Sequence, residues 1–245
     1  MLEMSSNYDA IAWVYRRYWG PFSVKRFMPV LKRLLLPRLP KGAHVLDLGC
    51  GTGNLAHVLW EEGYRVTGVD VSAGMLREAH EVAPGVEFVQ QDMRFFKRPK
   101  AFHAAIALFA TINHLESEED LQQVLENVKE SLVEGGWLMF DFNTASGLRE
   151  RWQGIEVVVA EDMVVVSRGQ YDENAGIATS TITAFRPQGR LWLRSDAEIR
   201  LRGYEEGEVE GLLGFVGFDE VEMRRLGGKA GQGRVFAVAR KPVCA

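Results

Sequence analysis

The chain has 245 residues, of which 47% are hydrophobic and 25% charged, and its formal net charge is −4. This length suits one large α/β domain, or a core with a small insertion, and the composition is ordinary for a soluble globular protein. The negative charge gives no overall attraction to nucleic acid or to an anionic membrane, and no apolar run approaches the roughly 20 residues that a membrane-spanning helix needs.

The cysteines and the first residues indicate the compartment. Cys244 is the penultimate residue, where chain ends are usually loose, so a structural disulfide with Cys50 is not expected and a reducing compartment fits. Residues 1–9 are polar and acidic and lack the basic-then-apolar pattern of a signal peptide. We therefore expect a cytoplasmic protein without a membrane partner.

Residues 5–40 are rich in aromatic side chains and follow helical periodicity. Tyr8, Tyr15 and Trp19 recur, with apolar residues between them, at spacings that place them on one helical face. A second periodic segment, residues 24–36, is closed by prolines. We expect a pair of helices that packs on the core. The alternative is that one of these aromatic residues faces a ligand, because tyrosine and tryptophan combine an apolar face with a polar tip.

Residues 44–56 predict a strand, a glycine turn and a helix. An apolar run typical of a buried strand is followed by three alternate glycines, Gly49, Gly51 and Gly53, after which Asn54 can cap a helix. This is the opening unit of a nucleotide-binding α/β domain. Glycines let the backbone reverse sharply, and they let a ligand lie against main-chain N–H groups at a helix start.

The alternation of strand and helix continues beyond this unit. Asp70 ends a second buried strand, where an acidic residue of a doubly wound fold accepts hydrogen bonds from ribose hydroxyls and would repel a 2′-phosphate. Ser72 can cap the next helix. Because strands alternate with helices, the sheet should be mostly parallel, with its ligand at the carboxyl ends of the strands. Further strands are expected at residues 86–90, 102–109 and 137–142, and a helix at 121–132 that Gly135 and Gly136 would end.

The pattern changes after residue 150. Residues 155–167, 177–185 and 191–201 are rich in β-branched side chains and predict a three-stranded antiparallel sheet. A return to the core is predicted by a helix at 205–213, a strand at 218–224, glycine-rich residues 227–233 and a last strand at 234–239.

These elements predict an α/β fold. We expect a Rossmann-like, seven-stranded, mostly parallel sheet with helices on both faces, and a small antiparallel insertion after strand five. The expected divisions are an N-terminal helical cap at residues 1–40, a core at 41–150 and 202–245, and the insertion at 151–201.

The glycine turn departs from the dinucleotide-binding pattern in two ways. Asn54 stands where Gly-x-Gly-x-x-Gly has its last glycine. Asp47 places a carboxylate beside the turn, where a negative charge does not favour a bound pyrophosphate. An acid at this point suits a ligand with a cationic group. The chain also contains Val-Leu-Asp-Leu-Gly-Cys-Gly-Thr-Gly, Gly-Val-Asp-Val-Ser-Ala-Gly-Met-Leu and Gln-Gln-Asp-Met in this order. With these motifs, residues 40–142 resemble the class I S-adenosylmethionine-dependent methyltransferases.

The resemblance implies a role for each matching residue. Asp47 would orient the methionine end of the donor, and Asp70 would hold the ribose hydroxyls. Asp92, with the Met93 amide, would read the N6 edge of adenine, which Val71 and Met75 would flank. The alternatives are a solvated loop carboxylate at Asp92 and plain core packing at Met75. The cofactor implied is S-adenosyl-L-methionine, with no metal, and the implied binding set is Asp47, Gly49, Cys50, Gly51, Gly53, Asp70, Val71, Met75, Asp92, Met93 and Leu108.

Chemistry at an activated sulfonium requires mainly that the acceptor, the methyl group and the sulfur are aligned. His114, just beyond strand four, could take a proton from the acceptor, because an unperturbed histidine has a pKa of about 6.5. The alternative is a surface or helix-start histidine. Tyr15 is a rival group for contacting the acceptor, and the other four histidines are expected to be structural.

The acceptor is expected to be a small molecule, methylated on nitrogen or oxygen by in-line displacement. No Asn/Asp-Pro-Pro-Tyr pattern follows strand four, and no Pro-Cys pair is present to attack a pyrimidine. An RNA or protein methyltransferase, or a donor-binding protein without catalysis, remains the alternative.

The end of strand five and the insertion are similar to glycine N-methyltransferase-like enzymes and amino-sugar N,N-dimethyltransferases. In that group an extra sheet covers the acceptor site or forms a homodimer contact. The insertion region carries arginines that could bind an anionic acceptor or could be solvated charges, namely Arg149, Arg151, Arg186 and Arg194.

Overall fold

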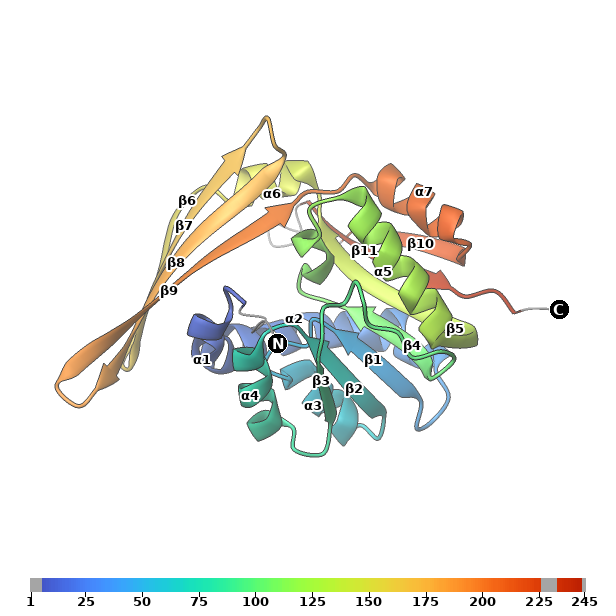
Figure 1. Cartoon of the computed structure of the whole chain (residues 1–245), viewed down its shortest axis with the longest axis horizontal. Helices are drawn as coiled ribbons and strands as arrows, with labels where there is room; N and C mark the ends of the chain where they lie inside the picture. Colours follow the sequence, from blue (N-terminus) through green and yellow to red (C-terminus); the bar gives the residue numbers. More distant parts are fainter. Residues whose placement is uncertain (1–5, 226–232, 244–245) are drawn as a thin grey trace.

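The computed structural model describes residues 6–225 and 233–243, and a seven-stranded sheet, sheet A, forms its centre (Figure 1). The strand order is β10-β11-β5-β4-β1-β2-β3. The strands from β3 to β5 run parallel, whereas β11 runs antiparallel to both β5 and β10. The predicted Rossmann-like fold is confirmed. The strands are β1 (His44–Leu48), β2 (Arg65–Asp70), β3 (Glu87–Gln90), β4 (Phe102–Ala107), β5 (Leu132–Asn143), β10 (Asp219–Arg225) and β11 (Arg234–Arg240).

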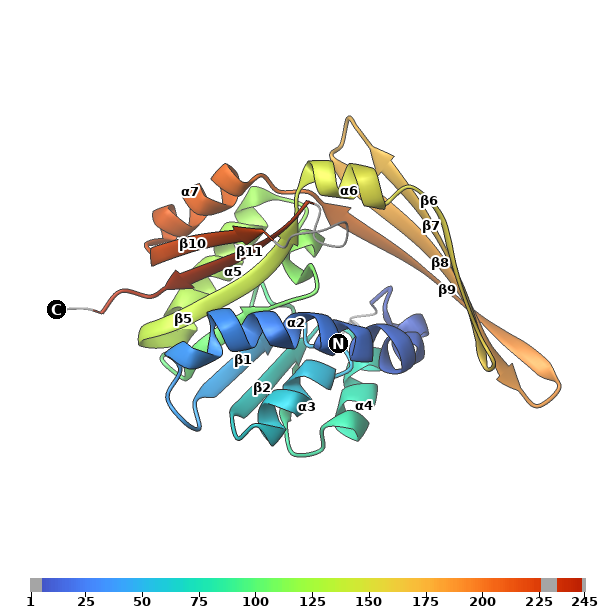
Figure 2. The same ribbon diagram turned by 180° about the vertical axis from the view of Figure 1, so that it is seen from behind.

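Helices cover both faces of sheet A (Figures 1 and 2). Apolar side chains of α5 and α7 pack on one face, and those of α2 and α3 pack on the other. In α4, Leu76 and Ala79 pack with Cys50 and Phe88 in a smaller cluster. Because both faces are covered, β1 is buried along its whole length, as its apolar run predicts. The helices are α2 (Gly20–Leu34), α3 (Asn54–Glu61), α4 (Ala73–Val82), α5 (Glu118–Ser131), α6 (Ala145–Arg151) and α7 (Glu206–Val216).

The N-terminal segment is one continuous helical stretch rather than the two separate helices predicted from the sequence. Pro21 directly follows the π-helical turn and Pro29 lies inside α2, and the helical stretch continues through both. The stretch passes through a π-helical turn, a form that is often found at functional sites. Before α2 it consists of η1 (Asp9–Ile11), α1 (Ala12–Val14) and the π turn η2 (Tyr15–Trp19), and a short η3 (Leu36–Arg38) follows α2.

The start of α3 differs from the sequence prediction. Gly53, with φ +72°, is the residue that precedes the helix, and Asn54 is its first residue rather than its cap. The Asn54 side-chain oxygen instead accepts a hydrogen bond from Thr52 Oγ1 at 2.6 Å.

The glycine pair Gly135-Gly136 does not end α5, which stops at Ser131. Both glycines lie inside β5, where the pairing with β4 slips between Leu132 and Trp137. Gly135 adopts φ +72°, so the irregularity is a bulge that needs a left-handed residue.

The insertion is an antiparallel sheet of four strands, sheet B, in the order β6-β7-β8-β9. The prediction of three strands was wrong, because residues 155–167 contain two strands: Ala160 pairs with Met163, so the chain reverses between them. Figure 1 shows sheet B as a long twisted ribbon beside the N-terminal helices, and Ile11 and Val14 pack with its apolar residues. The strands are β6 (Gly154–Ala160), β7 (Met163–Asp172), β8 (Ile177–Gln188) and β9 (Leu191–Arg202).

Some predicted features lie outside the described residues. They are residues 1–5 of the polar start, the glycine-rich segment apart from Gly233, and Cys244. Within the described ranges, no helix is long and apolar enough to span a membrane, and Cys50 is a buried free thiol.

Candidate active site

A cavity of about 500 Å³ lies at the carboxyl ends of the parallel strands of sheet A. β1 sits between β4 and β2, so this is the point where the strand order reverses, and doubly wound sheets bind their ligands at such a point. The volume is in the range of small-molecule sites. Its walls come from the loops after β1, β2, β3 and β4, from the N-terminal helical stretch and from β9.

The loop after β1 is left-handed at alternate residues. Gly49, Gly51 and Gly53 have φ values of +63°, +53° and +72°, a region that glycine occupies without strain. Gly49 is also confined by its neighbour, because a Cβ built there would lie 2.5 Å from Thr111 Cγ2. Gly49 and Gly51 line the cavity, whereas Gly53 does not.

Asp47 brings a buried carboxyl group to the cavity wall. Its side chain belongs to a residue only 3% exposed, and Oδ2 has no hydrogen-bond partner. Burial, with a contribution from the charge of Asp70, raises the pKa of Asp47 to about 8. A buried oxygen without a partner costs free energy, and a cationic donor group in the cavity would remove that cost.

Asp70 holds two loops together at the end of β2. Its Oδ2 accepts a hydrogen bond from the Gly51 amide at 2.8 Å, and its Oδ1 accepts one from the Ser72 amide at 2.9 Å. Burial raises the pKa of Asp70 in spite of these bonds. Each carboxylate oxygen keeps a further lone pair for a ligand hydroxyl. Ser72 caps α4 as predicted, accepting a hydrogen bond from the Met75 amide at 3.0 Å.

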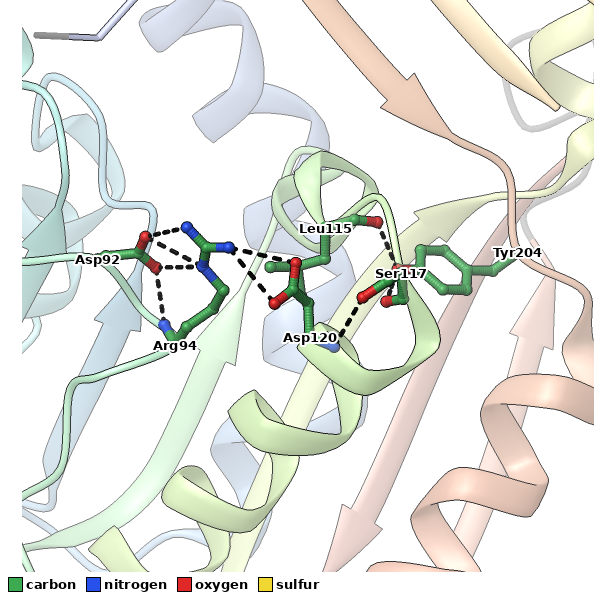
Figure 3. A network of polar contacts seen from close by, with 6 residues as sticks. All are labelled: Asp92, Arg94, Leu115, Ser117, Asp120 and Tyr204. Carbon is green, nitrogen blue, oxygen red and sulfur yellow. Dashed lines mark hydrogen bonds and ion pairs between the residues drawn. The ribbon is translucent and has the colours of Figure 1, made fainter. Parts of the chain in front are cut away.

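Asp92 and Met93 line the cavity after β3, but Asp92 is already engaged (Figure 3). Arg94 donates from Nε to both carboxylate oxygens at 3.1 Å and from Nη2 to Oδ2 at 2.6 Å, and its Nη1 reaches Asp120 at 3.3 Å. Burial favours a higher pKa for Asp92, but the hydrogen bonds and charge of Arg94 outweigh it and lower that pKa. The ion pair with Arg94 therefore occupies much of the Asp92 carboxylate that was expected to accept a hydrogen bond from the N6 amino group of adenine.

Figure 3 also shows how the start of α5 is fixed beside this pair. Ser117 caps α5 by accepting a hydrogen bond from the Asp120 amide at 3.1 Å. The hydroxyl of the fully buried Tyr204 donates to the Leu115 carbonyl at 2.6 Å. The segment after β4 is therefore tied to the chain that leaves sheet B.

Another part of the wall is aromatic. The Tyr8 hydroxyl and His114 Nε2 are hydrogen-bonded at 3.0 Å, and the Tyr15 ring lies 5.4 Å from that of Tyr8 and 6.4 Å from that of Phe109. Burial lowers the pKa of His114 to about 4, although a hydrogen bond to the Arg200 backbone opposes it. Burial also raises the pKa of both tyrosines. All three polar groups are therefore uncharged at pH 7.

The cavity gathers most of the residues singled out from the sequence. Every expected donor-binding residue except Gly53 lines it, and so do His114 and Tyr15, whereas Trp19 does not. None of the four arginines of the insertion region lines it; Arg149, for example, pairs with Glu173. Within the described residues, no group of three or more His, Cys, Asp or Glu side chains could hold a metal ion.

Sequence reasoning missed several charged residues of the wall. Arg200 on β9 donates to Glu116 from Nε at 2.9 Å and from Nη2 at 3.0 Å, and Glu198 lies two residues away on the same strand. Sheet B therefore supplies part of the cavity wall. No local pattern could have revealed this, because it depends on where β9 returns to the core. Arg94 was likewise missed, although it lies within two residues of the expected Asp92.

Residues 45–136 match the family described as a methyltransferase domain. A protein named as a methyltransferase from Geobacillus sp. (strain WCH70) is 32% identical over 143 residues, which are 56% of this chain and 58% of that protein. The dTDP-3-amino-3,4,6-trideoxy-alpha-D-glucopyranose N,N-dimethyltransferase of Streptomyces venezuelae is 29% identical over 60% of this chain and 62% of that protein. Trans-aconitate 2-methyltransferase of Paracidovorax citrulli is 46% identical over 31% of this chain and 32% of that protein. The chain thus spans about half of the length of the curated relatives that it matches.

Solved structures share the fold over nearly the whole chain. An S-adenosylmethionine-dependent methyltransferase from Clostridium acetobutylicum has a TM-score of 0.75 at 21% identity, covering 97% of this chain and 100% of that one. Streptomyces venezuelae DesVI has a TM-score of 0.77 at 22% identity, covering 93% of this chain and 95% of that one.

Proposed function

We propose that this chain, which carries a class I S-adenosylmethionine-dependent methyltransferase domain, transfers a methyl group from this donor to an amine nitrogen of a small molecule. The observation that carries the donor is the buried Asp47 Oδ2, which faces no partner at the wall of a cavity lined by left-handed glycines. The nitrogen is supported by the polar groups of the aromatic wall, His114, Tyr8 and Tyr15, which are weak bases at neutral pH. Of the carboxylates in the cavity wall, Glu116 and Asp120 are paired with arginines.

The residues present fit the donor. Asp47 offers a free oxygen to the ammonium group of the methionine end, and Asp70 offers further lone pairs to the ribose hydroxyls. Gly51 exposes its backbone to the cavity with nothing near the position of a Cβ. When bound, the donor supplies an activated methyl group on a sulfonium, so the chain needs no covalent nucleophile. The Asp92 carboxylate already accepts hydrogen bonds from Arg94, so we propose that it contacts adenine only through its remaining lone pairs.

The residues of the aromatic wall align the acceptor. Tyr8 and His114 hold each other by a hydrogen bond, and Phe109 and Tyr15 pack beside them, which fixes their ring positions. Preorganised groups of this kind contribute to rate by orientation. Because His114 Nε2 is bonded to the Tyr8 hydroxyl and the other ring nitrogen to the Arg200 backbone, we assign His114 as the residue that orients Tyr8. The Tyr8 hydroxyl oxygen is then the hydrogen-bond acceptor for the incoming group, with Tyr15 as the neighbouring contact.

Nitrogen is favoured over a hydroxyl oxygen by proton chemistry. A hydroxyl must lose its proton to become an effective nucleophile, and His114 with a pKa of about 4 is a weak base at neutral pH. Tyr8 and Tyr15, whose pKa values are raised, hold their protons even more firmly. A neutral amine has a lone pair ready for attack and releases its proton only after the methyl group is bound.

A carboxylate acceptor is disfavoured by the charges of the wall. Arg94 and Arg200 are the arginines that line the cavity within the described residues, and both are paired with carboxylates, Asp92 and Glu116. No arginine there is left with its charge uncompensated for an anionic acceptor. The net charge of −4 likewise gives no support for an RNA substrate.

The test compares matched acceptors with a methyl-labelled donor. D-Glucosamine, D-glucose and trans-aconitate present an amine, hydroxyls alone, and carboxylates, and a wider set of amines is paired in the same way with hydroxyl analogues. We expect S-adenosylhomocysteine to form, and label to appear on nitrogen, with amines alone. Label on hydroxyl or carboxylate oxygen, with amines inert, would contradict the assignment.

A homodimer through sheet B is supported by the edge strand β6. Ile155, Val157 and Val159 are 71%, 55% and 74% exposed, and no strand of residues 6–225 or 233–243 pairs with the outer side of their strand. Natural edges are usually protected by proline, charged side chains or a bulge, and β6 has only Glu156 of these. An antiparallel pairing of two copies about Val157 would place Ile155 opposite Val159 on both sides of a two-fold axis, so the edge is complementary to itself.

A further inference from the structure

The segment after β4 begins with two residues in an uncommon backbone conformation. Phe109 and Ala110 have φ values of +69° and +64°, although neither is glycine. A side chain in this region brings its Cβ close to the backbone carbonyl, so something must hold the turn. Consecutive backbone N–H groups in such a turn form a small concavity that binds anions.

Asp141 at the end of β5 supplies that anion from within the chain. The Ala110 amide donates to both carboxylate oxygens at 3.2 Å, and the Phe109 amide also donates to Asp141. Arg234 on β11 forms an ion pair with the same carboxylate, and its guanidinium lies 6.0 Å from the centre of the Phe109 ring. Asp141 is fully buried and Arg234 is 8% exposed.

The turn leads directly into the wall of the cavity. Leu108, Phe109 and Thr111 line it, and His114 follows at the end of the 3-10 turn η4 (Thr111–His114). Asp141 does not line the cavity itself. Its hydrogen bonds to the Phe109 and Ala110 amides connect it to the wall of the cavity through this turn.

We propose that Asp141, held by Arg234, is a positioning residue whose carboxylate fixes the left-handed turn at Phe109 and Ala110 and thereby places His114 against Tyr8. The consequence for methyl transfer rests on the proposed function, whereas the positioning does not. The two ideas can therefore be tested separately.

The test uses Asp141→Asn, which keeps the size of the side chain. Its amide group would face the Ala110 N–H and the Arg234 guanidinium, so the turn loses its anion. The titration of the His114 ring is followed by NMR, with the signal identified by its loss in His114→Gln. In the native chain the His114 pKa is about 4, because the ring is buried. In Asp141→Asn we expect it to rise toward the ordinary value of about 6.5 as the ring reaches water. Removing a negative charge would by itself lower the pKa of a histidine, so a rise reports displacement of the ring.

Binding of S-adenosylhomocysteine by the same variant separates positioning from general damage. We expect the dissociation constant to change less than threefold, because Asp47 and Asp70 lie on other strands. An unchanged His114 titration in a folded Asp141→Asn protein would overturn the proposal. Failure of the native chain to bind S-adenosylhomocysteine would count against the proposed function and leave the titration readout intact.

Two further variants complete the design. If Asp141→Asn does not fold, Arg234→Gln removes the partner of the ion pair while keeping the carboxylate in the turn. Because loss of a positive charge by itself raises the pKa of a histidine, this variant is read by the NMR contact between the Tyr8 and His114 rings. We expect that contact to weaken, and an unchanged contact would overturn the proposal. The matched control is Glu222→Gln on β10, which removes the half-buried ion pair with Arg38 of η3, away from the cavity. It should leave both the titration and the binding unchanged.

Discussion

Donor affinity should depend on pH through Asp47. The pKa of this buried carboxyl is raised to about 8, so most molecules of the free protein carry it protonated at pH 7. A bound ammonium group favours the carboxylate, so binding must release a proton. Affinity should therefore increase as pH rises and level off above about pH 8, once the free protein has ionised.

The size of the effect follows from the pKa. Ionising a group of pKa about 8 at pH 7 costs about 1.4 kcal/mol, which is a factor of about ten in the dissociation constant. We thus expect the dissociation constant of S-adenosylhomocysteine to fall about ninefold from pH 6 to 7 and about fivefold from pH 7 to 8, as long as the bound carboxyl stays ionised.

The assay is isothermal titration with S-adenosylhomocysteine at pH 6, 7 and 8, in pairs of buffers with different ionisation enthalpies, which count the released protons. Asp47→Asn should bind more weakly and lose the pH dependence. It should also raise the melting temperature of the free protein at pH 8, because a carboxyl whose folded pKa lies above its unfolded value destabilises the fold as pH rises from about 4 to 8. A flat dissociation constant for the native chain, with no proton release, would refute this reasoning.

Four other outcomes are expected. Asp70→Asn should weaken S-adenosylhomocysteine binding by about 1.5–3 kcal/mol, the value of a hydrogen bond to a charged group, and an unchanged dissociation constant in calorimetry would exclude it as the ribose ligand. Turnover on an amine should show no loss centred near pH 6.5 when pH is lowered from 8, because His114 is already neutral, and such a loss in a pH–rate profile would contradict its assignment. Gly51→Ala should lower stability by about 1–2 kcal/mol because φ is +53°, and an unchanged melting temperature would show that the loop relaxes. Val157→Asp should convert the dimer to a monomer in light scattering, and at protein concentrations where both chains are monomeric it should leave the melting temperature unchanged. A native chain that is already monomeric would exclude the β6 contact.

The fold could be predicted from local patterns because each carries its own physical signature. The buried apolar run before Gly49 and the strand that ends in Asp70 are defined by neighbours in sequence, and both lie where expected. The boundaries of some elements were predicted wrongly. Asn54 is a good cap by type, but Gly53 takes the left-handed position before the helix. The strand predicted at 155–167 hid a tight reversal, since β-branched residues continue on both sides of it.

The charged partners of the site were beyond sequence reasoning. The pairing of Asp92 with Arg94 depends on side-chain orientation, and the contact of Arg200 with Glu116 depends on the return of β9 to the core. The hydrogen bond from the Ala110 amide to Asp141 connects the turn after β4 with the end of β5. Such contacts are set by tertiary packing, and no spacing along the chain encodes them.

The most direct measurement of the central claim is thermal unfolding with S-adenosylhomocysteine and, separately, with NAD. A ligand at 100 times its dissociation constant stabilises the folded state by about 2.7 kcal/mol, which is a rise of about 5–10 °C in melting temperature for a chain of this size. We predict this rise with S-adenosylhomocysteine and none with NAD, because Asp47 can ionise against the ammonium group of the first, whereas the pyrophosphate of the second forms no ion pair with a carboxyl group. Equal rises, or a rise with NAD alone, would contradict the account.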